Sequence, residues 1–311
     1  MMADLRIGSR GSKLALWQAR HVSALLESRG HQVSIVTIET TGDRIADAPF
    51  AQVGSKGMFL KEIEEALLQK RVDLAVHSLK DIPTDIPRGL ELVAILPRED
   101  ARDAFLSVHH ASVMTLPLSA RVGTSSLRRQ AQMRVLRPDL KVEELRGNVD
   151  TRVLKLQSGE YDAILLAAAG VKRLQLTEHV KEWMAVDGMC PAPGQGALAL
   201  EIRDDDPDTR HLLAQFDDHT TRAAVECERA ALRRLGGGCH LPVGAHAVLD
   251  GEGLHLTVVV ARPDGSEILR DQRRGREPHH LGEASADALL LAGARRILDE
   301  LEGGSARGTQ T

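Results

Sequence analysis

A lysine and an aspartate stand next to each other at the polar end of a short apolar segment. Residues 72–83 read VDLAVHSLKDIP, in which Val72–Val76 is suited to a buried strand and His77–Asp81 form a polar tip. In open α/β sheets, ligands gather where strands end at their carboxyl edge. At such an edge Lys80 could hold an anion while Asp81 stabilises a developing positive charge. An ordinary ion pair on a solvated loop would have the same sequence. The other basic turns of the chain are therefore needed to choose between a functional site and an ordinary ion pair.

Basic and hydroxyl side chains recur at three later turns, each between an apolar strand and a helix. We predict these strands at 121–123, 142–145 and 162–167. The residues that follow them are Thr124, Ser125, Ser126, Arg128, Arg129, Arg146, Arg152, Lys172 and Arg173. Strands that alternate with helices indicate parallel βαβ units, which would bring the three turns to one sheet edge. A helix N-terminus with hydroxyl groups suits a carboxylate or a phosphate, and arginine suits carboxylates, so we expect a ligand with several acid groups there.

Arg128 and Arg129 are neighbours on one predicted helix. Successive residues of an α-helix point about 100° apart, and we therefore expect the two guanidinium groups to reach different acids. A solvated helix face explains any single arginine of the set at least as well. That explanation is poor for the whole set, because its members share matched positions in successive turns.

The charge of the chain is unevenly distributed. The formal net charge is −4, yet residues 121–173 contain eleven Lys and Arg against six Asp and Glu, a local charge of +5. A basic surface on an acidic protein indicates an anionic ligand held in one place. Nucleic acid is the obvious rival, but four Phe, two Trp and one Tyr leave few platforms for base stacking, and no nucleic-acid-binding motif is visible. We favour a small polyanion.

The N-terminal segment offers another anion site at a turn between a strand and a helix. Leu5–Gly8 is predicted as a strand and Lys13–Arg29 as a helix. Ser12 is suited to cap this helix, and Arg10 would lie where free backbone N–H groups already favour an anion. Further along, we predict a strand at 32–39, a polar loop at 40–55, a helix at 58–70 and a strand at 90–96.

Two polar or proline-rich segments, 97–103 and 191–196, indicate crossings between domains. A strand at 197–202 resumes after the second crossing, which predicts a discontinuous first domain and a hinge between two lobes. The third unit would contain a helix at 220–235, three strands with turns at 250–251 and 264–265, and a helix at 284–301. The expected domains are 1–98 with 195–216, the inserted 99–194, and 217–302, followed by a disordered tail at 303–311.

One of the three cysteines is placed for chemistry. Cys239 follows three glycines, so a loop could present its thiol to a cleft, and nearby positive charge would favour the reactive thiolate. Cys190 and Cys227 are better explained as small buried apolar residues. A hydrolase that uses Cys239 with His240 is conceivable, although adjacency in sequence is no evidence for a nucleophile–base pair. Three scattered cysteines predict neither a disulfide framework nor a metal site.

Several long motifs, in one collinear order over essentially the whole chain, point to a family. They are SRGSKLALWQ (9–18), VGSKGMFLKE (53–62), HSLKDIP (77–83), GTSSLRRQ (123–130), LRGNVDTR (145–152), APGQGA (192–197) and GGGCHLPVG (236–244). With these motifs the chain resembles porphobilinogen deaminase, also called hydroxymethylbilane synthase. The resemblance implies a transferase that condenses four porphobilinogen molecules head to tail, with loss of ammonia, into hydroxymethylbilane for tetrapyrrole (porphyrin and haem) biosynthesis.

The resemblance also implies a fold, a cofactor and roles for individual residues. The fold would have two periplasmic-binding-protein-like βα lobes joined by a two-stranded hinge, plus a small α+β C-terminal domain with a three-stranded sheet. A dipyrromethane cofactor would be bound covalently to Cys239 through a thioether, and Asp81 would be the catalytic carboxylate. The cofactor-binding residues would be Lys80, Ser126, Arg128, Arg129 and Arg152. The substrate-binding residues would be Arg10, Ser12, Gln18, Arg146, Arg173 and Gln195, and a lid would include Lys56 and Phe59.

The chemistry of these residue types agrees with the resemblance. Each pyrrole unit carries an acetate and a propionate, so a growing chain accumulates carboxylates that a row of arginines can bind. Loss of ammonia leaves a cationic electrophile, which Asp81 can stabilise, and thiolate attack on the same electrophile would anchor the primer at Cys239. The chain departs from the family pattern at two places. Gln52 stands where some relatives have a lysine, and residues 187–190 do not follow that pattern.

Two other functions stay open from the residues alone. A bilobed anion-binding protein without chemistry would not require Cys239 or Asp81, and a Cys-dependent hydrolase would use the thiol differently. No apolar run approaches the roughly 18 residues that span a bilayer, and the start of the chain lacks a signal-peptide pattern. We therefore expect a cytoplasmic protein that binds neither membrane nor nucleic acid. No extended apolar stripe is left for a large interface, so we expect a monomer.

Overall fold

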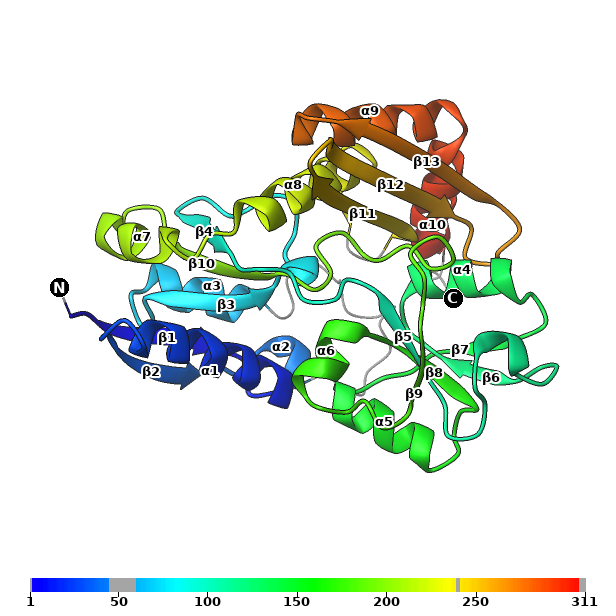
Figure 1. Cartoon of the computed structure of the whole chain (residues 1–311), viewed down its shortest axis with the longest axis horizontal. Helices are drawn as coiled ribbons and strands as arrows, with labels where there is room; N and C mark the ends of the chain where they lie inside the picture. The colour runs from blue at the N-terminus through cyan, green and yellow to red at the C-terminus, as the bar shows by residue number, and fades with distance from the viewer. Residues whose placement is uncertain (1, 45–59, 239–240, 308–311) are drawn as a thin grey trace.

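The computed structural model describes residues 2–44, 60–238 and 241–307. Figure 1 shows two α/β lobes and a third unit that packs against both of them. In the described residues each lobe contains a five-stranded sheet, and the third unit contains a three-stranded antiparallel sheet. The predicted α/β class, with two lobes and a small C-terminal α+β domain, is therefore confirmed. None of the described helices combines the length and the apolar character that a bilayer crossing requires.

The first lobe is built around a mixed sheet with the strand order β2-β1-β3-β10-β4. Its strands are β1 (Asp4–Ser9), β2 (Gln32–Thr37), β3 (Leu74–Ser78), β4 (Leu90–Ile95) and β10 (Leu198–Arg203). The first three run parallel, whereas β10 lies antiparallel between β3 and β4. Strands from before and after the second lobe therefore share one sheet. The helices of this lobe are α1 (Lys13–Glu27), α2 (Thr41–Arg44), α3 (Lys61–Leu68) and α7 (Pro207–Ala214).

The second lobe has the strand order β7-β6-β8-β5-β9. Its strands are β5 (Asp103–Leu106), β6 (Arg121–Gly123), β7 (Lys141–Glu143), β8 (Ala163–Ala167) and β9 (Val180–Trp183). The strands β6, β7 and β8 run parallel and are followed by α4 (Leu127–Leu136), α5 (Val149–Gln157) and α6 (Ala168–Arg173). A 3₁₀ turn, η3 (Val113–Thr115), lies between β5 and β6. The three strand-to-helix turns thus meet at one edge of one sheet, as predicted.

In the third unit two helices pack on the sheet, and a third helix follows them in the chain. It comprises α8 (His219–Arg234), β11 (Val243–Asp250), β12 (Gly253–Ala261), β13 (Ile268–Gly275), α9 (Pro278–Leu291) and α10 (Ala294–Arg307). The predicted turns between its strands are confirmed. Leu232 of α8, Leu256 of β12 and Leu289 of α9 belong to one apolar core. Figure 1 shows α8 between this sheet and the sheet of the first lobe.

The strand before the Lys80–Asp81 tip is shifted from its prediction at Val72–Val76. It runs from Leu74 to Ser78, so His77 belongs to the sheet and not to the polar tip. His77 Nε2 lies 3.0 Å from Glu201 Oε2 of β10, and both side chains are buried. The local sequence pattern cannot show this pairing, because its partner comes 124 residues later in the chain.

Several other boundaries differ from the predictions. The helix expected at 284–301 is two helices separated at Gly293, whose φ is 108°, and α10 continues to Arg307 inside the predicted tail. The helices α2 and α7 and the strands β5 and β9 were not predicted. The sheets of the two lobes are both mixed. In the first lobe β10 runs antiparallel to its neighbours, and in the second lobe β5 does so.

Candidate active site

Lys80 and Asp81 lie in a 3₁₀ turn, η2 (Leu79–Asp81), that follows β3 directly. The turn leaves Lys80 half-buried and Asp81 exposed. Burial is the main reason why the pKa of Lys80 is lowered to about 8; Asp81 opposes this shift, and two neighbouring arginines add to it. Burial therefore disfavours the charged form of the Lys80 ammonium group more than the nearby carboxylates favour it.

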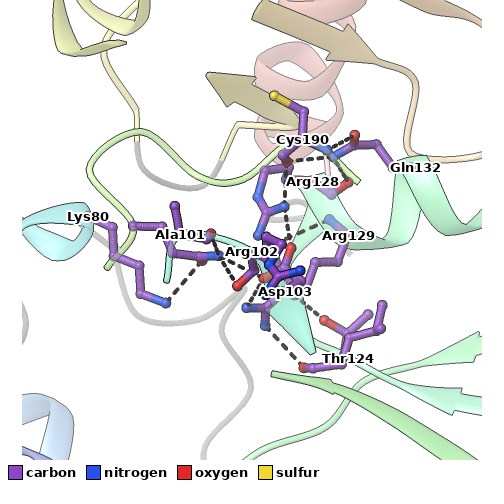
Figure 2. Close-up of polar contacts among 12 residues, drawn as sticks. Lys80, Ala101, Arg102, Asp103, Thr124, Arg128, Arg129, Gln132 and Cys190 are labelled. Carbon is purple, nitrogen blue, oxygen red and sulfur yellow. Dashed lines mark hydrogen bonds and ion pairs between the residues drawn. The ribbon is translucent and has the colours of Figure 1, made fainter. Parts of the chain in front are cut away.

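Two buried arginines of α4 converge on one carboxylate, Asp103 at the start of β5 (Figure 2). Arg128 Nη1 lies 2.7 Å from Asp103 Oδ2, and Arg129 donates to Oδ1 through Nε at 3.1 Å and Nη2 at 2.8 Å. Burial opposes the negative charge of Asp103, but the two guanidinium groups outweigh it and hold the pKa of Asp103 well below its usual value. The expectation that the two arginines reach different acids is wrong for the protein's own groups. Their side chains are long enough to meet at one buried carboxylate despite their different directions from the helix.

Further contacts fix the orientation of α4 and its arginines. Arg128 Nη1 also donates to the carbonyl of Cys190 at 2.7 Å, and Arg129 Nη1 donates to the carbonyl of Leu165 at 3.1 Å. Ser126 caps the helix, because its hydroxyl accepts from the backbone N–H of Arg129. Burial lowers the pKa of Arg129, although Asp103 opposes that shift. Both guanidinium groups are thus held in one orientation before any ligand arrives.

Gln195 joins the Lys80 turn to the start of β5. Its Nε2 donates to the carbonyl of Ala101 at 2.7 Å and to Asp103 Oδ1 at 2.9 Å, while Lys80 Nζ lies 3.5 Å from its Oε1. The next residue, Gly196, has a φ of 93°, and a Cβ there would lie 2.3 Å from the carbonyl oxygen of Glu99. The two crossings between the lobes therefore touch at this point, and only glycine fits.

Arg152 and Arg173 are further cations whose burial disfavours their charge. Burial lowers the pKa of each to about 10, with Asp81 opposing the shift at Arg152 and Glu99 at Arg173. Arg152 Nε donates to the carbonyl of Gly147 at 2.8 Å. Arg173 Nη2 donates to the carbonyl of Gly196 at 2.7 Å, and its guanidinium carbon lies 5.7 Å from the ring centre of Trp17. Arg173 of the second lobe therefore reaches α1 of the first.

The remaining predicted residues within the described part of the chain engage groups of the protein itself. Arg10 pairs with Asp43, with 3.2 Å between Nε and Oδ1. Arg146 Nη2 lies 2.6 Å from Glu144 Oε1. The hydroxyl of Ser12 caps α1 through the N–H of Ala15, as predicted, and Gln18 Nε2 donates to the hydroxyl of Ser78 at 2.9 Å.

Five positions singled out in the sequence lie outside the described residues. They are Gln52, Lys56, Phe59, Cys239 and His240. The other two cysteines are buried, as predicted, and burial raises the pKa of each to about 12, so Cys190 and Cys227 stay protonated thiols. Among the described residues no group of three or more His, Cys, Asp or Glu could hold a metal ion.

The residues around the Lys80 turn carry more positive than negative charge. Lys80, Arg128, Arg129 and Arg152 supply four positive charges, and Asp81 and Asp103 supply two negative ones. These groups influence one another's pKa values, which places them in one electrostatic cluster. We call these six residues the cationic cluster. Its net charge of +2 in a half-buried setting fits a ligand that carries several carboxylates.

Two family models match the chain in succession. "Porphobilinogen deaminase, dipyromethane cofactor binding domain" matches residues 5–211, and "Porphobilinogen deaminase, C-terminal domain" matches residues 222–291. The chain belongs to the porphobilinogen deaminase family. A porphobilinogen deaminase from Pelobacter propionicus is 51% identical to it over 302 residues, which is 96% of this chain and 97% of that protein.

Solved structures of other families share only a loose likeness with this porphobilinogen deaminase family member. A periplasmic substrate-binding protein of an ABC transporter from Coxiella burnetii has a TM-score of 0.42 and 16% identity, covering 68% of this chain and 90% of that one. A periplasmic domain of BvgS from Bordetella pertussis has a TM-score of 0.42 and 11% identity, covering 68% and 86%. At these values the likeness supports neither a shared ligand nor a shared activity.

The family match confirms the predicted enzyme class, the polymerisation of porphobilinogen for tetrapyrrole synthesis, and dipyrromethane as the cofactor. The roles of individual residues in this porphobilinogen deaminase family member stay predictions. Asp103 is the residue of the cationic cluster that the sequence interpretation missed, because it fell in a segment assigned to a crossing. One signal was available: a carboxylate that opens the apolar run DAFL must find a partner when that run is buried.

Proposed function

We propose that the chain condenses four porphobilinogen molecules head to tail, with release of ammonia, and delivers hydroxymethylbilane. The observation that carries this proposal is the net positive charge of the cationic cluster, which both lobes contribute to. Each ring added to the product brings an acetate and a propionate, and the arginines of the cluster are complementary to them. A substrate without acid groups would leave the excess positive charge of the cationic cluster uncompensated.

The cofactor that the family implies fits the same residues. We propose that dipyrromethane is joined to Cys239 by a thioether and that its acid side chains are held by Lys80, Ser126, Arg128, Arg129 and Arg152. Asp103 already orients Arg128 and Arg129, so little side-chain freedom is lost when they bind carboxylates. When bound, the cofactor supplies the pyrrole carbon to which the first substrate is added.

Asp81 is the proposed catalytic carboxylate. Departure of ammonia leaves positive charge on the pyrrole of the substrate, and a carboxylate held on a short turn stabilises that charge as it develops. Asp81 is exposed at the end of η2, where an incoming ring can reach it. Lys80 is adjacent and, when protonated, can hold an acid side chain of the same ligand.

The incoming substrate would be bound by residues of both lobes. We propose Arg10, Ser12, Gln18, Arg146, Arg173 and Gln195 for this role, with Lys56 and Phe59 in a lid. Arg10 and Arg146 pair with carboxylates of the protein, so substrate binding would exchange one carboxylate partner for another.

We further propose that the protein is organised as the domains 1–98 with 195–216, 99–194 and 217–302. The two crossings that touch at Gly196 would form a hinge between the lobes. A protein of this organisation would work as a cytoplasmic monomer on a small-molecule substrate, without nucleic acid or membrane.

Intact mass tests the proposed function most directly. The purified protein should exceed the mass of its sequence by one dipyrromethane, and the excess should disappear in Cys239→Ser. A fully active wild type with the bare sequence mass would refute the thioether. A bilobed anion-binding protein would carry no covalent adduct and would not release ammonia from porphobilinogen. A cysteine hydrolase would instead be acylated at Cys239 by activated esters.

A further inference from the structure

The segment directly after Asp81 is held by a helix of the third unit. Arg229 of α8 donates to two successive carbonyls, with Nη1 2.9 Å from the oxygen of Ile82 and Nη2 2.6 Å from that of Pro83. Arg233, one helical turn later, donates through Nη2 to the carbonyl of Thr84 at 2.9 Å. Two guanidinium groups thus bind three successive carbonyls of residues 82–84.

These contacts replace the support that regular secondary structure would give. Residues 82–84 belong to no helix or strand, and Pro83 has no N–H to donate. Val225 lies one turn before Arg229 on α8, and it packs in the same buried apolar cluster as Ile82 and Leu79 of the η2 turn. Residues spaced by four share one helix face. One face of α8 therefore contacts both the side chains and the carbonyls around Asp81.

The helix that makes these contacts is itself fixed. Glu228, fully buried in α8, accepts from Arg98 Nη1 at 2.6 Å, from the N–H of Gly194 at 2.7 Å and from the N–H of Ala247 at 2.7 Å. These donors come from the first crossing, the second crossing and β11. Beyond the end of α8, a Cβ on Gly237 would lie 3.0 Å from the Thr84 hydroxyl. The glycine turn that precedes Cys239 therefore touches the segment that the two arginines hold.

We propose that Arg229, assisted by Arg233, is a positioning residue of the reaction: it holds the Ile82–Thr84 backbone so that the Asp81 carboxylate meets the reacting pyrrole. The inference rests on the proposed function, since it requires Asp81 to be the catalytic carboxylate. In this proposal Arg229 and Arg233 contact neither the cofactor nor the substrate. Their effect passes through the backbone that follows Asp81.

The first measurement compares turnover in Arg229→Met and Arg229→Lys. Methionine keeps much of the apolar stem but removes both donors, and a misplacement of about 1 Å can cost roughly 100-fold in rate. We expect kcat of Arg229→Met to fall by about 10- to 100-fold while KM for porphobilinogen changes by less than about threefold. Lysine can still reach one carbonyl, so Arg229→Lys should recover part of kcat. Arg233→Met should lose less, because that arginine binds one carbonyl and is exposed.

Arg134→Met is the matched control for loss of an arginine that binds a backbone carbonyl between units. Arg134 of α4 donates to the carbonyl of Pro263 in the third unit, away from the Asp81 segment. All variants should carry one dipyrromethane by intact mass, and their thermal midpoints should be compared. If Arg134→Met loses as much kcat as Arg229→Met, or if kcat merely follows the folded fraction, Arg229 has only a structural role and the proposal is wrong.

A double-mutant cycle with Asp81→Asn decides whether Arg229 acts through Asp81. Single-turnover rates of the loaded enzyme should show that Arg229→Met costs less than about threefold in the Asp81→Asn background, although it costs far more in the wild type. Additive losses would overturn the positioning role while leaving the proposed function intact. Near-normal turnover of Asp81→Asn itself would instead overturn the catalytic assignment on which the inference rests.

Discussion

At the scale of single residues, the site separates two carboxylates by their environments. Asp103 is fully buried and pairs with two arginines, whereas Asp81 is exposed on a short turn. Groups of the same type take different roles when their surroundings differ in this way. Asp103 is therefore a fixed counter-ion, and Asp81 is the carboxylate that a substrate can meet.

Asp81→Asn should keep the fold and lose most of the turnover. The amide has the size of the carboxylate but no charge to balance the cation that forms when ammonia leaves, and losing such an electrostatic contact costs about 100- to 1000-fold in kcat. The release of ammonia from porphobilinogen measures the rate, and intact mass controls for cofactor loading. A loaded variant with near-normal rates would rule out the catalytic role of Asp81.

Lys80 should make cofactor assembly sensitive to pH. Its pKa of about 8 means that the ammonium form predominates below that pH and is lost above it, so attraction for the acid side chains should weaken as pH rises through 8. The thiolate fraction of a cysteine rises over the same range, which would act in the opposite direction. The rate at which apo-protein gains the dipyrromethane mass, followed from pH 6.5 to 9.5, measures the sum.

Lys80→Arg separates these two effects, because an arginine stays charged throughout the range. The variant should show only the rise expected from the thiol, whereas the wild type should decline relative to it above about pH 8. Identical profiles for the two proteins would mean that the protonation of Lys80 does not govern assembly.

At the scale of elements, the sequence predicted the turns that carry the arginines better than the tertiary contacts that hold these turns in place. The strands β6, β7 and β8 and the helices after them follow from local apolar runs and turn residues, and their parallel pairing brings the arginines together. The pairing of Arg128 with Asp103 joins residues 25 apart in sequence and needs the tertiary fold. The four-residue edge strand β9 is too short to show a clear alternation. The start of α7 does carry a readable signal, an Asp206 cap followed by Pro207.

Asp103→Asn tests the link between β5 and α4. The change leaves two buried guanidinium groups without a counter-charge, and breaking a buried pair in this way costs about 3–5 kcal/mol. Denaturant unfolding should show this loss in full when Asp103→Asn is introduced into Cys239→Ser, which cannot attach the cofactor. In the loaded enzyme Asp103→Asn should cost less, because the acid groups of the cofactor would partly replace the missing charge.

Asp139→Asn is the matched control in the same lobe. Asp139 pairs with Arg137 at the end of α4 with its side chain 28% exposed, so its loss should leave the free energy of unfolding of either form close to its starting value. Equal losses for Asp103→Asn in apo and loaded protein would contradict the claim that the cofactor acids bind at Arg128 and Arg129.

At the scale of the whole molecule, one buried carboxylate connects the parts. Glu228 binds Arg98 of the first crossing, Gly194 of the second crossing and Ala247 of β11. The sequence indicated two crossings and a third unit, since both crossings are polar or rich in proline and glycine. It could not show that a glutamate of α8 joins them, because an isolated glutamate on a helix normally faces solvent.

Glu228→Gln should loosen the attachment of the third unit to both lobes. Glutamine keeps an acceptor for one backbone N–H, but it leaves Arg98, whose side chain is 12% exposed, without its counter-charge, at a cost of about 3–5 kcal/mol. We expect calorimetry to show an early transition for the third unit, because a weakened interface lets units unfold separately. Arg234→Met on the same helix removes only an exposed pair with Asp287 and should leave a single transition close to that of the wild type. Replacing the ion pair by an apolar pair in the double variant Arg98→Met, Glu228→Met should recover little of the lost stability. The N–H groups of Gly194 and Ala247 would stay buried without an acceptor. A fully recovered double variant would show that the ion pair alone, and not the convergence of both crossings and β11 on Glu228, holds the three parts together.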